Sequence, residues 1–491
     1  MSPTRRSPFE PFEPSGRAFP PLRVAAESFD VGIIGGGFAG TMAAVWLARL
    51  APRPLRIVLF DRSAAFGRGA AYSPGSDACL LNVRAKAMGA FADAEGDFVR
   101  WLRAVGYGVE DPDLGERFLP RRLYGEYLCS LLDRSAANGT LIERRAACVA
   151  GLTPTDDGYA LDTACATRTF AKSVVVAIGN LPPGGFGVPA LTTAMRTHAR
   201  NPWQFLAGEQ VAPDARVLIV GTGLSALDVL LHLEAGGHRG RIAMLSRHGR
   251  FPLPHASCAS ASGMTPGPLA GVPADIVRSV RHFVRDAEGA GCAWQDVIDA
   301  LRPHADRVWQ NWSLAEQRRF LRHVAPLWEI HRHRAPQSTL DTRDRLIAAG
   351  RLTVHRGRLT QLNADAAGLC ATFVPAGGSG APTALNVDVV IDCTGPRRDI
   401  AASGDGFVES LLARGIAQAG PLGIGFAATP ELALMTTFSG APIYALGTPL
   451  RGMLAETSAV REIRCQAQAV AAAIVERLAP AMLRVRSTAD G

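Results

Sequence analysis

The feature that most constrains this chain is a glycine-rich turn that follows a short apolar segment at 31–34. Residues 35–40 read G-x-G-x-x-G, and an Ala-rich segment at 41–50 predicts a helix after them. In such a turn Gly35 permits the tight bend, Gly37 lets the backbone approach a pyrophosphate, and Gly40 lets the helix lie close to the strand. The pattern predicts a helix whose N-terminus faces phosphate groups.

A second apolar segment at 56–60 predicts the next strand, and it ends at Asp61. This places a carboxylate about 20 residues beyond the glycine turn, where it can accept hydrogen bonds from a ribose. Strand, turn, helix, second strand and terminal acid together predict a nucleotide-binding β-α-β unit. The alternative is a glycine-rich turn that holds no ligand.

The same order of elements restarts at residue 216. A strand at 217–220 leads into Gly221-Thr222-Gly223-Leu224-Ser225-Ala226, a helix at 227–235 and a strand at 241–245. Here the second strand is followed by Arg247, His248 and Arg250 instead of an acid. Because an arginine can clamp a 2′-phosphate that an acid would repel, this end favours NADP over NAD. The alternative is that Arg247 is an ordinary surface arginine.

Each unit is followed by a similar segment. Residues 141–152 and 351–362 both lead through a turn into a return strand, and apolar strands at 173–179 and 388–395 then end in Gly179 and Gly395. Such a repeat indicates two fold-sized units rather than one long domain. Between the two ribbons, residues 274–350 have a polar, helical pattern and are too long for a loop, so we expect a helical insertion.

Composition narrows the class of protein. The formal net charge is +8 and almost all of it comes from arginine, which suits anionic ligands but also suits a compositional bias. No motif for binding nucleic acid accompanies these arginines. The uncharged stretch at 31–48 is long enough to span a bilayer, but its glycines fit a strand, turn and helix better. We therefore expect no membrane contact, no export signal and a cytoplasmic location.

The nine cysteines are scattered singly, with no CxxC or CxxxxC pair. This spacing argues against a zinc site and against a dithiol redox centre. His331 and His333 are two residues apart, which separates them on a helix, so we read them as polar or substrate-facing and predict no metal site.

Several further segments extend the pattern. They are Gly67-Arg68-Gly69-Ala70-Ala71-Tyr72-Ser73, Leu80-Leu81-Asn82-Val83, Pro120-Arg121-Arg122-Leu123-Tyr124-Gly125, Asn201-Pro202-Trp203, His331-Arg332-His333-Arg334 and Gly447-Thr448-Pro449-Leu450-Arg451-Gly452 with Glu456-Thr457. With the two glycine motifs, they make the chain resemble two-dinucleotide flavoproteins and, more closely, the FAD-NAD(P)-binding family of bacterial flavoproteins. The resemblance covers residues 31 to 470 or so, and the family does not determine a substrate.

The resemblance implies an α/β fold with two Rossmann-like domains, the NAD(P)-binding domain being inserted in the FAD-binding domain. We expect a disordered tail at 1–27, the first part of the FAD-binding domain at 28–205, and the NAD(P)-binding domain at 206–395 with its helical insertion at about 270–350. The return part of the FAD-binding domain and a C-terminal helix should occupy 396–480.

The resemblance also implies roles for residues. Asn82 matches an asparagine beside the flavin in flavin-containing monooxygenases, where an amide can serve catalysis; the alternative is a turn-capping asparagine. The residues expected to bind FAD are Gly35, Gly37, Phe38, Ala39, Gly40, Asp61, Arg62, Arg68, Gly69, Tyr72, Asn82, Val83, Gly179, Gly447, Arg451, Gly452 and Thr457. Those expected to bind NADPH are Gly221, Gly223, Leu224, Ser225, Arg247, His248 and Arg250, with Gly395 at the end of the last strand.

Three functions fit these features. We expect an FAD-dependent, NADPH-using monooxygenase that hydroxylates a small polar substrate with O₂ through a C4a-peroxyflavin. The alternatives are an NAD(P)H-dependent reductase that passes electrons to another acceptor, and a redox-sensing flavoprotein without turnover. The missing CxxxxC pair excludes a disulfide reductase that uses such a pair. The Arg- and Trp-rich insertion is a candidate surface for oligomer formation.

Overall fold

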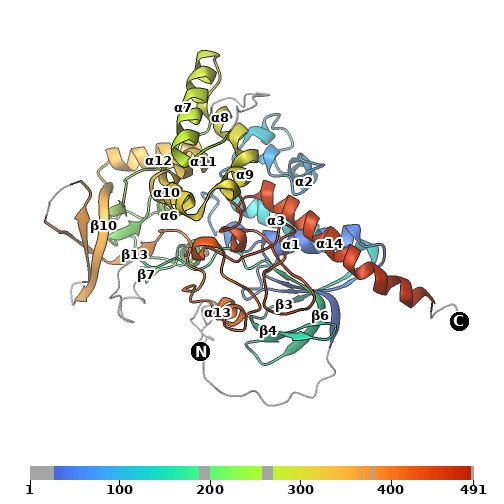
Figure 1. The fold of residues 1–491 in the computed structure, drawn as a ribbon. Coiled ribbons are helices and arrows are strands. Elements are labelled where there is room, and N and C mark those ends of the chain that lie inside the picture. The colour runs from blue at the N-terminus through green and yellow to red at the C-terminus, as the bar shows by residue number, and fades with distance from the viewer. Residues whose placement is uncertain are drawn as a thin grey trace.

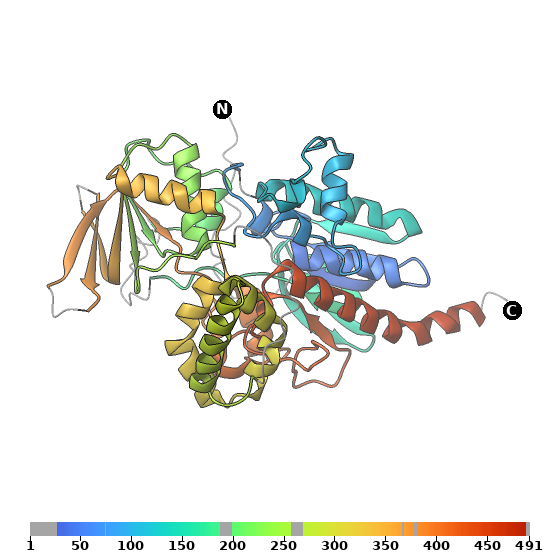
Figure 2. The same cartoon turned by 90° about the horizontal axis from the view of Figure 1, so that it is seen from above.

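The computed structural model describes residues 27–73, 75–186, 199–256, 269–365, 368–377 and 381–487. The tail expected at 1–27 lies outside the described residues except for Glu27. The chain forms two α/β units with a group of helices beside them (Figures 1 and 2). The predicted fold class is confirmed, because each unit has a parallel sheet with a Rossmann-like order of strands and helices.

The first sheet is built around β1, which directly precedes the first glycine turn. Its parallel strands lie in the order β3 (Leu141–Arg145), β2 (Arg56–Phe60), β1 (Ser28–Ile34), β6 (Arg168–Val176) and β14 (Ile443–Ala445). An antiparallel ribbon of β4 (Val149–Thr155) and β5 (Gly158–Thr163) continues from the first half of β6. The last strand, β14, comes from the C-terminal part of the chain, so this unit is closed only after the second unit has been completed.

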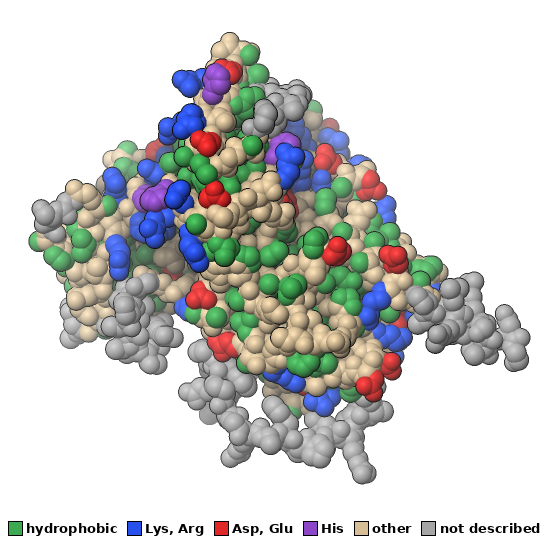
Figure 3. Space-filling view, viewed as in Figure 1, with side chains coloured by type: hydrophobic (Ala, Val, Ile, Leu, Met, Phe, Trp, Pro, Cys, Tyr) green, Lys and Arg blue, Asp and Glu red, His purple; other side chains and the backbone are tan. Residues whose placement is uncertain are grey.

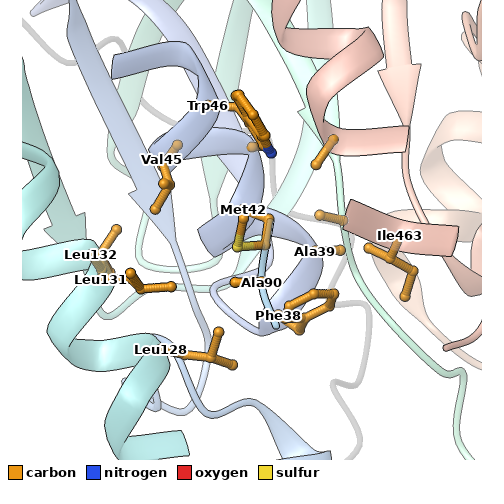
Figure 4. Close-up of a cluster of buried hydrophobic side chains, with 14 of the residues drawn as sticks. Phe38, Ala39, Met42, Val45, Trp46, Ala90, Leu128, Leu131, Leu132 and Ile463 are labelled. Atoms are coloured by element: carbon orange, nitrogen blue, oxygen red, sulfur yellow. The ribbon is translucent and has the colours of Figure 1, made fainter. Parts of the chain in front are cut away.

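One face of the first sheet is covered by α1 (Phe38–Leu50), α3 (Arg121–Arg134) and α14 (Val460–Ser487). Helix α1 is buried on nearly every side, as its run of apolar residues requires. Figure 4 shows Phe38, Met42 and Trp46 of α1 among side chains of α3 and α14. This packing fixes the direction in which the N-terminus of α1 points.

The second sheet repeats this plan. Its parallel strands lie in the order β10 (Leu352–Asp365), β9 (Ile242–Ser246), β8 (Val217–Val220), β13 (Val389–Asp392) and β7 (Ala199–Arg200). Strands β11 (Gly368–Pro375) and β12 (Thr383–Val387) extend it as an antiparallel ribbon. Because β7 pairs with β13, the chain enters the second sheet before residue 206, where the sequence suggested that this domain starts.

The helical insertion interrupts the connection from β9 to β10. Five helices come first: α7 (Pro273–Gly289), α8 (Trp294–Leu301), α9 (Ala305–Asn311), α10 (Leu314–His323) and α11 (Ala325–Arg332). Helix α12 (Gln337–Ala348) then packs on α6 (Leu224–Ala235) and on β10, so it is the crossover helix that two parallel strands require. The inserted helices lie beside both units, and α7 projects outward from them (Figures 1 and 2).

Shorter helices complete the fold. They are α2 (Asp97–Ala104), α5 (Pro202–Leu206) and α13 (Gly406–Ala413). Among the described helices, none is both long enough and apolar enough to cross a membrane.

Candidate functional site

The first glycine turn lies tightly against the end of a neighbouring strand. Gly35 has a φ of +109°, and a Cβ there would collide with the carbonyl oxygen of Ala177. A Cβ on Gly40 would collide with the carbonyl oxygen of Gly35. Both glycines are therefore required by packing, because no space is left for a side chain, and at Gly35 the φ also disfavours an L side chain.

The N-terminus of α1 is suited to phosphate. Its N-cap residue is Gly37, no side chain caps the helix, and no acidic residue lies in its first turn. The segment 67–73 lies over this turn: Gly67 N donates to Gly36 O at 2.8 Å, and a Cβ on Gly69 would come within 2.9 Å of the Gly37 Cα. Uncapped N–H groups and the helix dipole both favour an anion here.

The acid at the end of β2 fixes the same turn. Asp61 Oδ2 accepts a hydrogen bond from Gly36 N at 2.9 Å, and its Oδ1 accepts from Ser63 N at 2.8 Å and from Ser63 Oγ at 2.6 Å. Arg62, which we expected to bind FAD, forms an ion pair with Asp405 at 3.3 Å. The Arg62 guanidinium is thus directed toward the N-terminus of α13 in this structure.

A cavity of about 1490 Å³ lies between the two units and the insertion. Tyr72, Asn82 and Val83 line it from the first unit. Burial raises the pKa of Tyr72 to about 12, so its hydroxyl stays protonated at neutral pH. Within the described residues, the Asn82 side-chain amide makes no hydrogen bond, which does not fit a turn-capping role.

His255 lies beside Asn82. Its Nε2 donates to the backbone oxygen of Asn82 at 2.9 Å. Burial, and then the charge of Arg334, lower the pKa of His255 to about 4, so the imidazole is neutral at neutral pH. The Pro254-His255 pair after β9 carried no recognised motif, and sequence analysis missed this residue.

The loop after β14 is held by a closed set of buried hydrogen bonds. Gly447 N donates to Gln466 Oε1, Gln466 Nε2 donates to Thr457 Oγ1, and Thr457 Oγ1 donates to Gly447 O, each at 2.9 Å. Gly447 itself has a φ of +75°. Arg451, in the same loop, lines the cavity. The cluster holds Gly447 and Thr457, two residues expected to bind FAD, against each other.

Gly452 in this loop has a packing role. A Cβ there would collide with the carbonyl oxygen of Ile424, and its own carbonyl accepts a hydrogen bond from Trp309 Nε1 at 3.0 Å. The remaining expected FAD residues are spread around the same region: Phe38 and Ala39 are buried in the first turn of α1, Arg68 is exposed in the overlying segment, and Gly179 follows β6 with a φ of +69°.

In the second glycine turn, one glycine is required by packing and another leaves space for a ligand. Gly221 has a φ of +129°, and a Cβ there would collide with the carbonyl oxygen of Cys393. A Cβ on Gly223, by contrast, would meet no atom within 4 Å. No described residue requires a glycine at 223, so its small size leaves open space in the cavity, as an approaching pyrophosphate would need.

Helix α6 starts at this open space. Its N-cap residue is Gly223, no side chain caps it, and its first turn contains no acidic residue. Leu224 and Ser225 begin the helix and line the cavity together with Gly395, which follows β13. The residues present therefore fit a bound dinucleotide in the second unit, as those around α1 do in the first.

Arginines surround the end of β9. The pKa of His248 is lowered, chiefly by burial and then by the positive charges nearby. These charges belong to Arg247, Arg250 and Arg356, so the three arginines lie close to His248. No ion pair to Arg247, Arg250 or Arg356 occurs among the residues that the structure describes. Thr222 Oγ1 donates to Arg250 O at 2.6 Å, which ties this cluster to the glycine turn.

An ion pair joins the two units across the cavity. Arg121 at the start of α3 lies 2.8 Å from Asp228 of α6, and Arg121 also donates to Leu80 O at 3.0 Å. Asp228 is buried, and burial raises its pKa while Arg121 lowers it. No sequence pattern indicates this pairing, because its partners belong to different units.

His331 and His333 of the insertion do not belong to a group of side chains that could bind a metal. His331 stacks edge-on against Trp294, and His333 forms an ion pair with Glu329 at 3.1 Å. Across the described residues, no three His, Cys, Asp or Glu side chains are grouped so as to hold a metal ion.

The chain has the fold of proteins with two dinucleotide-binding domains. Residues 32–181 match the family model described as FAD-NAD(P)-binding, which confirms over this region the family resemblance that the sequence motifs indicated. No curated protein is detectably similar in sequence.

Solved structures share the whole fold. The ornithine N-hydroxylase of Kutzneria sp. 744 has a TM-score of 0.65 at 17% identity, over 92% of this chain and 99% of that chain. The L-lysine 6-monooxygenase of Pseudomonas syringae has a TM-score of 0.63 at 18% identity, over 91% and 99%. A bacillithiol disulfide reductase of Staphylococcus aureus has a TM-score of 0.54 at 13% identity, over 92% and 99%. At these identities the similarity concerns the fold.

The two glycines of the second turn provide a matched pair of substitutions. Gly221→Ala should destabilise the protein by about 3 kcal/mol or more, because both its φ and the Cys393 carbonyl oppose a side chain. Gly223→Ala should leave the melting temperature within a degree or two of the parent but weaken NADPH binding at least tenfold, because the methyl group occupies open space in the cavity. Thermal unfolding and NADPH titration of the FAD-loaded proteins measure both effects. Unchanged NADPH affinity in Gly223→Ala would show that the second glycine turn does not contact NADPH.

Proposed function

We propose that the chain is an FAD-dependent, NADPH-using oxidoreductase and, more narrowly, a flavin monooxygenase. The observation that carries the proposal is the shared cavity of about 1490 Å³, which both Asn82 of the first unit and Gly223 of the second unit line. Two dinucleotides bound at two such turns can bring their reactive rings together in one shared cavity. Flavin and nicotinamide must meet in this way for hydride transfer.

Each unit would hold its cofactor by similar means. The N-terminus of α1 would receive the FAD pyrophosphate, and Asp61 would accept hydrogen bonds from the adenosine ribose. The N-terminus of α6 would receive the NADPH pyrophosphate, with Arg247 and Arg250 on the 2′-phosphate. Bound FAD would supply the redox chemistry, accepting a hydride and passing electrons to O₂. The chain itself would bind the two cofactors, orient their rings and shield them from water.

The described cysteines form no disulfide that could act as a redox centre. All eight cysteines in the described part of the chain are free thiols. Cys79 and Cys393 are buried, and burial raises the pKa of both, so neither is disposed to act as a thiolate. Electrons would therefore leave through the flavin to an acceptor that enters the cavity.

The monooxygenase is favoured by the surroundings of Asn82. Its amide makes no hydrogen bond within the described residues, and the neighbouring His255 is neutral and held by a backbone oxygen. A neutral amide that is free to donate can stabilise negative charge developing on an oxygen atom. The solved structures named as ornithine and lysine hydroxylases share the fold over nearly the whole chain, which also supports this choice.

The second candidate is a reductase. The bacillithiol disulfide reductase of Staphylococcus aureus shares the fold, so the fold alone is compatible with either activity. A reductase would need a separate acceptor that reaches the cavity, such as a quinone. The two candidates differ in what reduced flavin does with O₂.

The choice of NADPH is tested by Arg247→Ala. Loss of one charge-assisted contact to the 2′-phosphate should raise the KM for NADPH by about 10- to 100-fold and leave the KM for NADH nearly unchanged. Arg239→Ala is the control, since Arg239 lies in the same unit but pairs with Asp214 on the surface. Equal effects of Arg247→Ala on both coenzymes would refute the 2′-phosphate contact.

The choice of monooxygenase is tested by mixing anaerobically reduced protein with O₂ in a stopped-flow spectrometer. We expect a spectroscopically distinct transient between reduced and oxidised flavin, with a shorter lifetime in Asn82→Ala because the amide is lost. Asn363→Ala, at an exposed position of β10, should not change that lifetime. Direct return to oxidised flavin in the parent protein, with rapid reoxidation by a quinone, would favour the reductase instead.

A further inference from the structure

A second large cavity, of about 1340 Å³, lies within the helical insertion. Helices α7 to α11 form most of its wall, with α7 contributing the largest share, and the side chains that line it are mainly apolar. Along α7 these include Ile276, Val277, Val280 and Val284. Figure 3 shows hydrophobic side chains along the projecting α7.

Aromatic side chains make one end of this cavity rigid. Trp309 and Trp312 are 5% and 9% exposed, and their rings contact each other edge to face at 6.3 Å between centroids. Trp312 Nε1 donates to Gly271 O at 2.9 Å, and Trp309 Nε1 donates to Gly452 O. Because each indole N–H has a backbone partner, the polar edges are satisfied and the remaining ring surface is apolar.

The apolar cavity is continuous with the cofactor cavity. Five polar or charged residues line both of them: Glu329, His333, Arg398, Arg451 and Ser458. Arg451 and Ser458 belong to the loop that follows β14, which is the loop expected beside the flavin. A molecule in the apolar cavity would thus reach the place where the flavin ring is expected.

The junction carries an excess of positive charge. Glu329 forms an ion pair with His333 at 3.1 Å. Burial opposes ionisation of the Glu329 carboxyl, but the bond to His333 and the charges of Arg451 and Arg398 lower its pKa to about 2. Burial lowers the pKa of Arg451, which reflects the cost of a guanidinium in this position. No ion pair to Arg398 or Arg451 occurs within the described residues. An anionic group on a ligand could pair with both guanidinium groups, of which that of Arg398 is exposed at the surface.

We propose that the apolar cavity binds the substrate, and that this substrate is a carboxylic acid with a bulky aromatic or alicyclic body. The body lies among the tryptophans and the apolar face of α7, and the carboxylate lies on Arg398 and Arg451 beside the flavin site. The inference rests on the proposed function, since it assigns the substrate class of that oxidoreductase. It replaces the small polar substrate expected from the sequence, because a short polar amine would leave the apolar wall uncovered.

The test is calorimetric titration of the oxidised, FAD-loaded protein with 2-naphthoate in the presence of saturating NADP⁺. We expect 2-naphthoate to bind and 2-naphthylmethanol, which lacks the charge, to bind at least tenfold more weakly. Arg398→Gln should weaken 2-naphthoate about tenfold without affecting 2-naphthylmethanol, and Arg398→Lys should restore part of the loss.

A second pair of variants tests the location. Val277→Trp should weaken both probes at least tenfold, because the larger ring fills the cavity beside α7. Ser279→Trp is the control, since Ser279 is exposed on α7 and does not line the cavity. Circular dichroism melting of both variants separates loss of binding from loss of fold.

The proposal would be overturned by absence of 2-naphthoate binding, by binding that occurs without NADP⁺ and is lost when NADP⁺ is added, or by equal binding to the parent and Val277→Trp. Displacement would place the probe in the cofactor cavity instead. Because the titration needs no turnover, its failure is distinct from failure of the proposed monooxygenase, which the reaction with O₂ measures. A short diamine such as cadaverine should not compete with 2-naphthoate, and effective competition would favour a polar substrate.

Discussion

Close contact between a turn glycine and a carbonyl at the end of a neighbouring strand determines the geometry of both proposed dinucleotide sites. Gly35 lies against Ala177 in the first unit, and Gly221 lies against Cys393 in the second. In each case the absence of a Cβ lets the turn close directly onto the end of its sheet, and the following helix begins uncapped. The two helix N-termini are thereby fixed relative to the cavity that the units share. The acid of the first unit and the arginines of the second unit lie at positions that these turns and helices fix.

A second set of contacts joins the insertion to the first unit. Buried Arg332 of α11 forms a two-bond ion pair with buried Glu456, at 3.0 and 2.7 Å, and Arg302 lies 2.6 Å from Glu462 of α14. Glu456 belongs to the loop of Gly447 and Arg451. Removing one partner of such a pair would leave an uncompensated buried charge, so the loop and the insertion are held as one structure. The wall of the apolar cavity is therefore tied to the loop expected beside the flavin.

Much of the fold could be predicted from the sequence, because each unit contains a local sequence pattern that is typical of a dinucleotide-binding β-α-β unit. Strand periodicity and glycine spacing at 31–61 and 217–246 depend on near neighbours, and the structure places β1, α1, β8 and α6 there. The pairings that build the cavity could not be predicted in this way. Arg121 with Asp228, and Arg332 with Glu456, join residues more than 100 positions apart, and neither pair has a sequence pattern. The arginine cluster at 247–250 was visible, but the second cavity depends on how the five helices α7 to α11 pack, which composition does not encode.

The central claim is that one chain brings nicotinamide and flavin together in one cavity. Its most direct test is anaerobic reduction of the FAD-loaded protein by saturating NADPH carrying deuterium at the 4R or the 4S position of the nicotinamide. The account predicts that one of the two labelled coenzymes slows the loss of flavin absorbance through a primary isotope effect, while the other does not, because a fixed cavity presents one face of the ring. Failure of NADPH to reduce the flavin, or reduction without any isotope effect under single-turnover conditions, would contradict it.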